Sequence, residues 1–81
     1  MKSFYVLLNS IDKVKNFVNM AATINGDLDL VGGRYIVDAK SIMGIFSLDL
    51  SQSLRLDIHD ETQVDRCLQV IEPYLVHPEN K

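Results

Sequence analysis

The segment Ser53-Leu-Arg-Leu-Asp-Ile-His59 is the stretch that decides the fold. Its apolar and polar side chains alternate, with two leucines and an isoleucine on one side and Arg55 and Asp57 on the other. Successive side chains of a strand point to opposite faces, so the pattern predicts a strand with one covered face and one face in water. It favours an antiparallel sheet with its helices packed on one side.

Two further segments are predicted to supply neighbouring strands. Residues 4–8 form an unbroken apolar run that is too short for a helix, which favours a strand covered on both sides or placed at the centre of a sheet. Residues 28–39 alternate on either side of Gly32-Gly33, a pattern typical of a hairpin with that pair as its two-residue turn.

Two other segments have helical periodicity. The first follows Ser10, which occupies an N-cap position. Its apolar stripe consists of Ile11, Val14, Phe17, Val18, Ala21 and Ala22. The second begins at Asp60-x-x-Gln63, which resembles a capping box, and Pro73 is expected to kink it or end it near Glu72. Its apolar stripe consists of Val64, Cys67, Leu68, Ile71 and Leu75.

With a short helix after Ser41, the order of elements is β-α-β-β-α-β-α. This predicts an α+β fold with a four-stranded antiparallel sheet and helices on one face. The chain of 81 residues has no repeats, low-complexity stretches or linkers, so we expect one domain over residues 1–76. Residues 77–81 are expected to form a fraying tail.

Charge and size exclude several classes of function. Eight Lys and Arg against eleven Asp and Glu give a net charge of −3 with no basic run, which disfavours nucleic acid and anionic membranes as partners. No apolar run approaches the roughly 18 residues of a membrane span, and the N-terminal run is too short for a secretory signal. We therefore expect a cytoplasmic protein, and at this size no deep catalytic cleft.

Few residues could carry chemistry. Cys67 has no second cysteine at metal-ligand spacing and lies in an apolar stripe, so it is expected to be a buried small hydrophobe. His59 and His77 lie at a strand end and in the tail, without the spacing of a triad or metal site, and are expected to be exposed bystanders. No catalytic residue, cofactor or metal site is predicted.

Residues 41–50 contain the main candidate for a binding surface. At about 100° per residue, Ile45 and Leu48 share one side of a short helix while Ile42, Met43 and Phe46 share the other. A short surface helix can rest only one side on the core, so the second side is expected to be an exposed partner site. The alternative is an irregular helix with both sides covered by neighbouring loops.

Ser41 precedes this helix, where its side-chain oxygen would accept a hydrogen bond from a first-turn amide. One interpretation is that Ser41 is a simple N-cap. The other is that it is a site of phosphorylation, since helix N-termini attract anions and Lys40 adjoins it. A phosphate of about −2 charge would lie beside Ile42, Met43 and Phe46 and would change the preference of a partner.

The segment Val37-Asp-Ala-Lys-Ser41-Ile-Met-Gly-Ile-Phe-Ser-Leu48 resembles HPr, the histidine phosphocarrier of the bacterial sugar phosphotransferase system. Ala21-Ala-Thr before it and Leu54-Arg-Leu-Asp-Ile58 after it add to the resemblance, and Lys40-Ser-Ile-Met-Gly44 is a motif specific to that family. The order of elements agrees over nearly the whole chain. The resemblance implies an open-faced β-sandwich of four antiparallel strands with helices on one side.

The phosphate-transfer site of the family is not kept. In HPr proteins a histidine at the start of the first helix takes phosphate from phosphoenolpyruvate by way of the first enzyme of the system. An arginine two residues later, followed by proline, helps to hold that phosphate. Counting back from Lys40-Ser41 without gaps places Ser10 at the histidine position, Asp12 at the arginine position and Lys13 at the proline position. Asp12 would repel the phosphate that an arginine would bind.

The second site of the family is kept. In HPr proteins of many Gram-positive bacteria the serine matching Ser41 is phosphorylated by an ATP-dependent HPr kinase/phosphorylase. The modified protein is corepressor with a catabolite-control transcription factor. A paralogue, the catabolite-repression HPr, also lacks the histidine and keeps the serine. Family members dock through residues matching Ile42, Met43 and Phe46.

The resemblance therefore implies a divergent, non-enzymatic HPr-like regulator of bacterial carbon catabolite repression. Ser41 would be its phosphorylation site. The partner-binding residues would be Lys40, Ile42, Met43 and Phe46. The partners would be an HPr kinase/phosphorylase-like serine kinase, a catabolite-control transcription factor or phosphotransferase components. Two alternatives remain, a phosphocarrier that uses a different residue and a degenerate HPr domain with an unrelated binding role.

Overall fold

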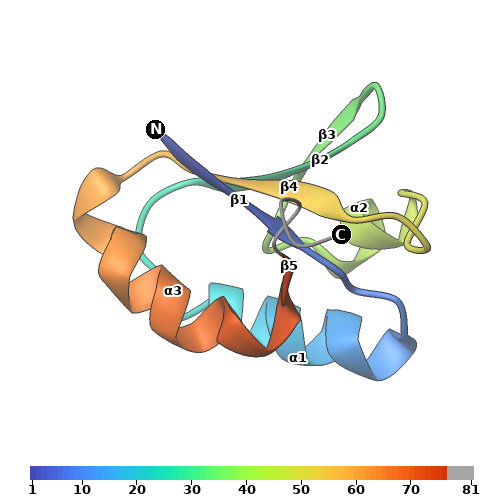
Figure 1. Cartoon of the computed structure of the whole chain (residues 1–81), viewed down its shortest axis with the longest axis horizontal. Coiled ribbons are helices and arrows are strands. Elements are labelled where there is room, and N and C mark those ends of the chain that lie inside the picture. The colour runs from blue at the N-terminus through green and yellow to red at the C-terminus, as the bar shows by residue number, and fades with distance from the viewer. Residues whose placement is uncertain (77–81) are drawn as a thin grey trace.

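The computed structural model describes residues 1–76, which form an antiparallel sheet with helices on one side (Figure 1). The strands are β1 (Lys2–Val6), β2 (Leu28–Gly32), β3 (Tyr35–Asp38), β4 (Leu54–Ile58) and β5 (Leu75–Val76). The α-helices are α1 (Ile11–Ala21), α2 (Ile42–Phe46) and α3 (Val64–Ile71), and 3-10 turns cover Glu61–Gln63 and Glu72–Tyr74. The predicted α+β architecture is confirmed, although the sheet has five strands instead of the predicted four. The predicted tail at 77–81 lies outside the described residues.

The strand order is β3-β2-β4-β1-β5, and every neighbouring pair is antiparallel. Leu54, Leu56 and Ile58 of β4 are all buried on the helix side of the sheet, as their alternation predicts. Figure 1 shows α1 and α3 lying side by side beneath the sheet, while none of the described helices covers the opposite face. We call this opposite face the open face.

The first strand differs from its prediction in position and in environment. It spans Lys2–Val6 instead of residues 4–8, and Tyr5 is 40% exposed on the open face. Only the alternate residues point into the core, so the expected cover on both sides is wrong. An unbroken apolar run contains no period, so it cannot reveal which of its residues face water. The strand does lie inside the sheet, between β4 and β5.

Helix α1 starts where the sequence predicts, with Ser10 as its N-cap. Val14, Phe17 and Ala21 are buried beneath the sheet, and the ring of Phe17 packs edge to face against Tyr74 with centroids 5.8 Å apart. Ile11 is 62% exposed and Ala22 is also exposed, so the predicted stripe is wrong at both ends of the helix. These two residues occupy the first helical position and the C-cap, outside the central turns that cover the sheet.

The last helix is shorter than predicted and begins differently. The Asp60 carboxylate accepts a hydrogen bond from the Thr62 amide at 3.0 Å and caps a 3-10 turn, while Gln63 makes no capping bond, so the expected capping box is absent. Helix α3 ends at Ile71, just before Pro73, as predicted. Leu75 leaves the helical stripe and pairs with β1 as part of the short fifth strand, because proline prevents the helix from continuing.

The hairpin between β2 and β3 has Gly33-Arg34 as its turn, one residue later than predicted. Gly32 pairs with Tyr35, which leaves two loop residues between the strands. The φ angle of Gly33 is +58°, and no residue other than glycine has a positive φ in the described chain. A positive φ at only the first loop position is the pattern of a type II′ turn, which places glycine there.

Candidate functional site

Helix α2 has one buried and one exposed side, as the sequence predicts. Ile45 is fully buried and Leu48 is 7% exposed, whereas Met43 is 77% exposed and Phe46 is 40% exposed. Ile42 lies at the edge and is partly covered. The alternative in which loops cover both sides is therefore wrong. We call Ile42, Met43 and Phe46 the α2 surface.

Gly44 explains how so short a helix is held in place. A Cβ at this position would lie 3.2 Å from the Cβ of Val37 and 3.3 Å from the Ser41 hydroxyl oxygen. These distances are shorter than ordinary van der Waals contact, so glycine lets the helix backbone approach β3 closely. The close contact fixes one side of α2 against the sheet and leaves the α2 surface facing outward.

Ser41 is held by three hydrogen bonds at the start of α2. Its hydroxyl oxygen accepts from the Gly44 amide at 3.1 Å, its amide donates to the Asp38 carbonyl at 3.0 Å, and its carbonyl accepts from the Ile45 amide at 3.0 Å. The predicted N-cap is confirmed. The side chain is half-buried, and its hydroxyl proton has no acceptor within residues 1–76.

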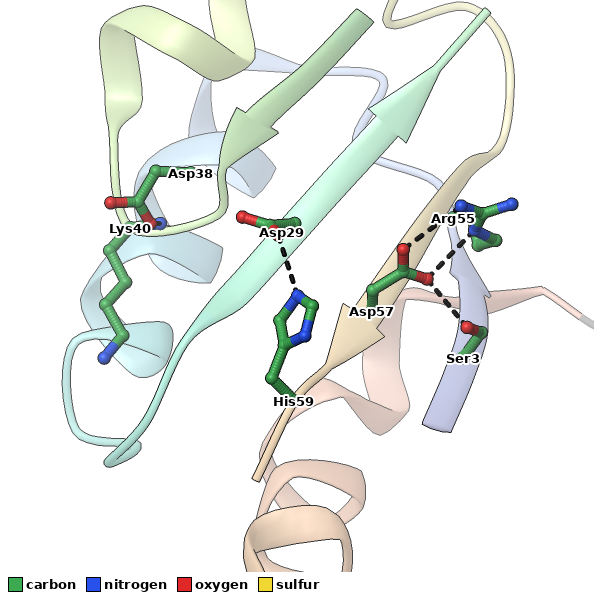
Figure 2. A network of polar contacts seen from close by, with 7 residues as sticks. All are labelled: Ser3, Asp29, Asp38, Lys40, Arg55, Asp57 and His59. Carbon is green, nitrogen blue, oxygen red and sulfur yellow. Dashed lines mark hydrogen bonds and ion pairs between the residues drawn. The ribbon is translucent and has the colours of Figure 1, made fainter. Parts of the chain in front are cut away.

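Lys40 adjoins Ser41 in sequence, but its side chain extends elsewhere. The Nζ atom donates to the carbonyls of Ile24 at 2.7 Å and Gly26 at 3.0 Å, in the loop that follows α1. Figure 2 shows the amine extended away from the start of α2, while the Lys40 amide donates to the Asp38 carboxylate at 2.9 Å. Lys40 thus ties two loops together, and its contact with a partner stays a prediction.

The start of α1 contains no imidazole. Ser10 occupies the N-cap, where its hydroxyl oxygen accepts from the Lys13 amide at 3.1 Å. Lys13 in turn donates from Nζ to the Asn9 side chain at 2.9 Å, and Asp12 is exposed in the first turn. At this end of α1, Ser10 provides a hydroxyl in place of an imidazole, and its oxygen caps the helix.

His59 lies at the opposite end of the sheet from Ser10. The register pairs Lys2 with Ile58 at one end of β1 and Val6 with Leu54 at the other, and the chain enters α1 after Val6. His59 therefore cannot reach the start of α1. His77 lies outside the described residues.

His59 is not a bystander in the structure, because its Nε2 atom lies 2.8 Å from the Asp29 carboxylate (Figure 2). Both side chains are partly exposed on the open face. The partner belongs to β2, 30 residues earlier in the chain. Single-sequence reasoning missed this pair since only the β2–β4 register brings the two residues together.

A second polar cluster surrounds Asp57, which is 5% exposed although its alternation predicted a wet position. Its carboxylate accepts from Ser3 at 2.7 Å and from Arg55 Nε and Nη2 at 2.9 and 3.1 Å (Figure 2). Burial by itself raises the pKa of Asp57, but the hydrogen bonds from Arg55 and Ser3 outweigh it and leave this pKa below the ordinary value. The cluster is thus a charged, satisfied network that cross-links β1 and β4.

The sequence offered one signal for this cluster. Arg55 and Asp57 are two residues apart on a strand, so they share a face, and opposite charges there can pair. The third member, Ser3, becomes visible only through the register that pairs it with Asp57.

A groove of about 540 Å³ lies between the hairpin turn and the segment after α2. It is lined by Gly32, Gly33, Arg34, Tyr35, Ser47, Asp49, Gln52, Ser53 and Leu54. None of the residues of the α2 surface lines it, so the two features are separate. Sequence reasoning did not find the groove because its two walls come from distant segments.

The remaining candidates carry no reaction centre. Cys67 is buried, and burial raises the pKa of its thiol, so the interpretation as a small hydrophobe is confirmed. Within residues 1–76 no three His, Cys, Asp or Glu side chains are grouped to hold a metal ion. In the same part of the chain, no helix has the length and apolar character needed to cross a bilayer.

The comparison with solved structures bears on the fold. The crystal structure of HPr-C-His from Thermoanaerobacter tengcongensis is similar to this chain with a TM-score of 0.71 and 26% sequence identity. The match covers 89% of this chain and 92% of that chain. The fold is HPr-like. Neither a family model nor a curated protein matches this sequence.

The HPr-like fold extends over nearly the whole chain, so it includes both α2 and the start of α1. The three-dimensional match supports the resemblance seen around Ser41. It leaves open the chemistry at Ser10 and Ser41, which depends on individual side chains.

Proposed function

We propose that this protein is an HPr-like regulator connected to the sugar phosphotransferase system, which binds protein partners through the α2 surface and does not transfer phosphate. The observation that carries the proposal is the exposure of Met43 and Phe46 beside a serine that caps the helix. Methionine and aromatic residues are enriched in protein interfaces. Their burial by a partner would contribute roughly 25 cal/mol for each Å² of apolar surface removed from water.

The start of α1 supports the absence of phosphate transfer. A phosphocarrier needs a nucleophile that accepts and releases phosphate readily, and the family uses an imidazole for this step. Ser10 presents a hydroxyl in place of the imidazole, and a serine phosphate ester releases its phosphate far less readily than a phosphoimidazole. Asp12 adds negative charge to the same turn, which repels an incoming phosphoryl group.

The alternative phosphocarrier would have to use another residue. His59 is the one imidazole within the described residues, and its partner Asp29 leaves the Nδ1 atom free. Asp57 lies two residues earlier on the same face of β4, so a second carboxylate shares the face of the sheet on which this ring lies. A phosphoryl donor would meet like charge there, which disfavours this alternative.

Phosphorylation of Ser41 would serve as the switch of the α2 surface. The phosphate would add about −2 charge directly before Ile42, at a position where first-turn amides can bind anions. The hydroxyl proton is unengaged within the described residues, which suits attack on ATP. Because the Lys40 amine is bound to two carbonyls, the new charge would be compensated by helix amides and by the partner.

The proposal is tested by incubating the protein with ATP and an HPr kinase/phosphorylase, followed by intact-mass spectrometry. We expect one phosphate on the wild-type protein and on Ser10→Ala, and none on Ser41→Ala. An unmodified wild-type protein would contradict the switch, while binding through the α2 surface would remain open to measurement.

A second assay distinguishes our proposal from the alternative that the protein is a phosphocarrier. The protein is incubated with labelled phosphoenolpyruvate and the first phosphotransferase enzyme, with an HPr that keeps its histidine as the positive control. We expect no acid-labile phosphate on this protein. Labelling that is lost in His59→Ala would establish the alternative in place of our proposal.

The degenerate-domain alternative predicts a different result. In that case Ser41 is merely a cap, and Ser41→Asp leaves every partner interaction unchanged because aspartate also caps helices. Under our proposal Ser41→Asp alters the affinity of the α2 surface for its partner, while the thermal stability changes little.

A further inference from the structure

Strand β3 forms one edge of the sheet, and no other strand within residues 1–76 pairs with its outer side. The Ala39 amide donates to the Leu28 carbonyl at 2.8 Å, which identifies Leu28 and Ala39 as a hydrogen-bonded pair of the antiparallel ladder. Such pairs recur at every second residue, so Tyr35 and Val37 also point their backbone groups toward β2. The amide and carbonyl of Ile36 therefore point outward, away from the sheet.

This edge lacks two of the usual protections against pairing. Tyr35 and Ile36 are 65% and 67% exposed, and the strand contains no lysine and no proline. Tyr35, Ile36 and Val37 are aromatic or β-branched, which favours strand pairing. Helix α2 packs against Val37 from the helix side and leaves Ile36 uncovered on the open face.

The sequence of the edge is self-complementary. Arg34-Tyr-Ile-Val-Asp38 has a cation at one end, an anion at the other and apolar residues between them. In an antiparallel pair of two copies centred on Ile36, Arg34 of each copy lies opposite Asp38 of the other. Tyr35 lies opposite Val37, and the two Ile36 residues exchange their backbone hydrogen bonds. Cross-strand pairs of these kinds stabilise sheets.

Neither charged end of this segment has an ion-pair partner in the part of the chain that the structure describes. The register places Asp38 directly opposite Asp29, and like charges in that position repel each other. Asp29 has His59 at 2.8 Å, but Asp38 has only the Lys40 amide, since the Lys40 amine is engaged elsewhere (Figure 2). Arg34 is exposed and makes no ion pair within residues 1–76.

We propose that β3 pairs with β3 of a second copy of this chain, in the antiparallel register centred on Ile36. The two sheets join into one continuous sheet, and each Asp38 gains an Arg34 of the other copy. This symmetric arrangement closes on itself and leaves no new edge at the contact. The proposal does not rest on the proposed function, because it uses no residue of the α2 surface.

The association is expected to be weak. A contact of about five residues on each side buries less than the roughly 1,200 Å² of a stable interface. Two exposed ion pairs add modest affinity and are screened by salt. We therefore expect dimers at high protein concentration and low ionic strength, in a range that sedimentation equilibrium covers.

The test exchanges the charges. Arg34→Asp and Asp38→Arg are each prepared alone, combined in one chain, and mixed as the two single variants. Sedimentation equilibrium from about 10 μM to 1 mM is expected to show self-association of the wild-type protein. Each single variant places like charges at both ends of the contact and should associate at least about tenfold more weakly. The equimolar mixture and the double variant should regain the wild-type association.

Hydrogen exchange of the Ile36 amide locates the contact. We expect its protection to increase with protein concentration, while the Val37 amide, already paired with β2, stays unchanged. If Asp38→Arg does not fold, Asp38→Asn replaces it, because an amide keeps the acceptor for Lys40 and removes the charge.

Three results would overturn the proposal. One is a wild-type protein that stays monomeric at 1 mM, a concentration about a hundredfold above the start of the series. Another is association that the charge reversals do not change. The third is self-association without protection of the Ile36 amide, which would assign the contact between the two copies to another surface.

Discussion

Two helices of this protein start with a serine cap of the same geometry, and their surroundings differ. Ser10 accepts from the Lys13 amide and Ser41 from the Gly44 amide, in both cases at 3.1 Å and three residues ahead. The turn after Ser10 continues with a single exposed isoleucine and then charged residues. The turn after Ser41 carries the α2 surface. The serine cap by itself therefore does not mark a candidate binding site. The exposed apolar side chains next to Ser41 distinguish it from Ser10.

The largest effect expected from this comparison concerns partner binding. If a serine kinase binds the α2 surface as we propose, Met43→Lys should weaken that binding by about 100-fold, because a charge would replace the most exposed apolar side chain of this surface. Ile11→Lys, the matched change after Ser10, should cost less than about tenfold since that isoleucine stands alone. Titration calorimetry measures both. Equal losses would show that the two helix starts form one surface.

The second effect concerns the buried polar cluster around Asp57, which contains neither of the two serine caps. Asp57→Asn should lower the free energy of unfolding by about 2 kcal/mol at pH 7, because the buried carboxylate loses charge-assisted bonds from Arg55 and Ser3. Urea denaturation measures this change. Asp49→Asn is the control, because that carboxylate bonds a serine in the same way but is exposed. A loss as large in Asp49→Asn would place the effect outside the buried network.

The loss in Asp57→Asn should depend on pH. The pKa of Asp57 is lowered in the folded protein, so the carboxylate stabilises the fold above the unfolded-state pKa of about 3.9. This contribution should be lost as the pH falls below about 4 and through the folded pKa. The difference between wild type and Asp57→Asn should therefore shrink in acid. A constant difference from pH 7 to pH 3 would contradict the charged network.

The third effect compares how tightly α2 and α1 are packed, through the change in stability that an added or removed side chain causes. Gly44→Ala should destabilise the protein by about 1 to 2 kcal/mol, because the new Cβ would press on Val37 and on the Ser41 oxygen. The control is Asn16→Ala in the exposed part of α1, where alanine favours the helix and stability should rise slightly. Thermal unfolding measures both. A neutral Gly44→Ala would mean that α2 can move away from β3 at little cost.

The smallest effect concerns the caps themselves. Ser10→Ala and Ser41→Ala should each lower the free energy of unfolding by about 1 kcal/mol, because each leaves a first-turn amide unpaired. Both losses should be independent of pH, since a hydroxyl cap carries no charge. Urea denaturation at pH 7 and pH 4 is the measurement. A much larger loss at Ser10 alone would show that only the longer helix needs its cap for folding.

The sequence predicted most of the fold because local patterns control it. Alternation located β4, and helical periodicity located α1 and α3. The two apolar groups on opposite sides of α2 predicted that one of them would be exposed. The predictions that failed concern features that periodicity does not determine. The run at residues 4–8 has no period, and the position of the hairpin turn depends on the strand register, which differs by one residue from the prediction. Leu75 has helical spacing, but Pro73 ends the helix before it.

In the candidate site, as in the fold, the features that lie within one segment were predictable from the sequence, whereas contacts between distant segments were not. Ser41 and the α2 surface lie within one short segment, so spacing alone revealed them. The pairs between His59 and Asp29 and between Ser3 and Asp57 join residues 30 and 54 positions apart. No periodicity connects such residues, and only strand register shows that they meet.

The amino-acid sequence by itself determined the order of the elements, both helix caps and the exposure of Met43 and Phe46, because each depends on neighbours within a few residues. The tertiary structure alone decided which charges meet on the open face and how closely α2 approaches β3. It also decided that Arg34 and Asp38 lie at an edge of the sheet without an ion pair among residues 1–76. These features follow from the register of strands distant in the chain, and a shift of one residue would turn every side chain of a strand to the other face.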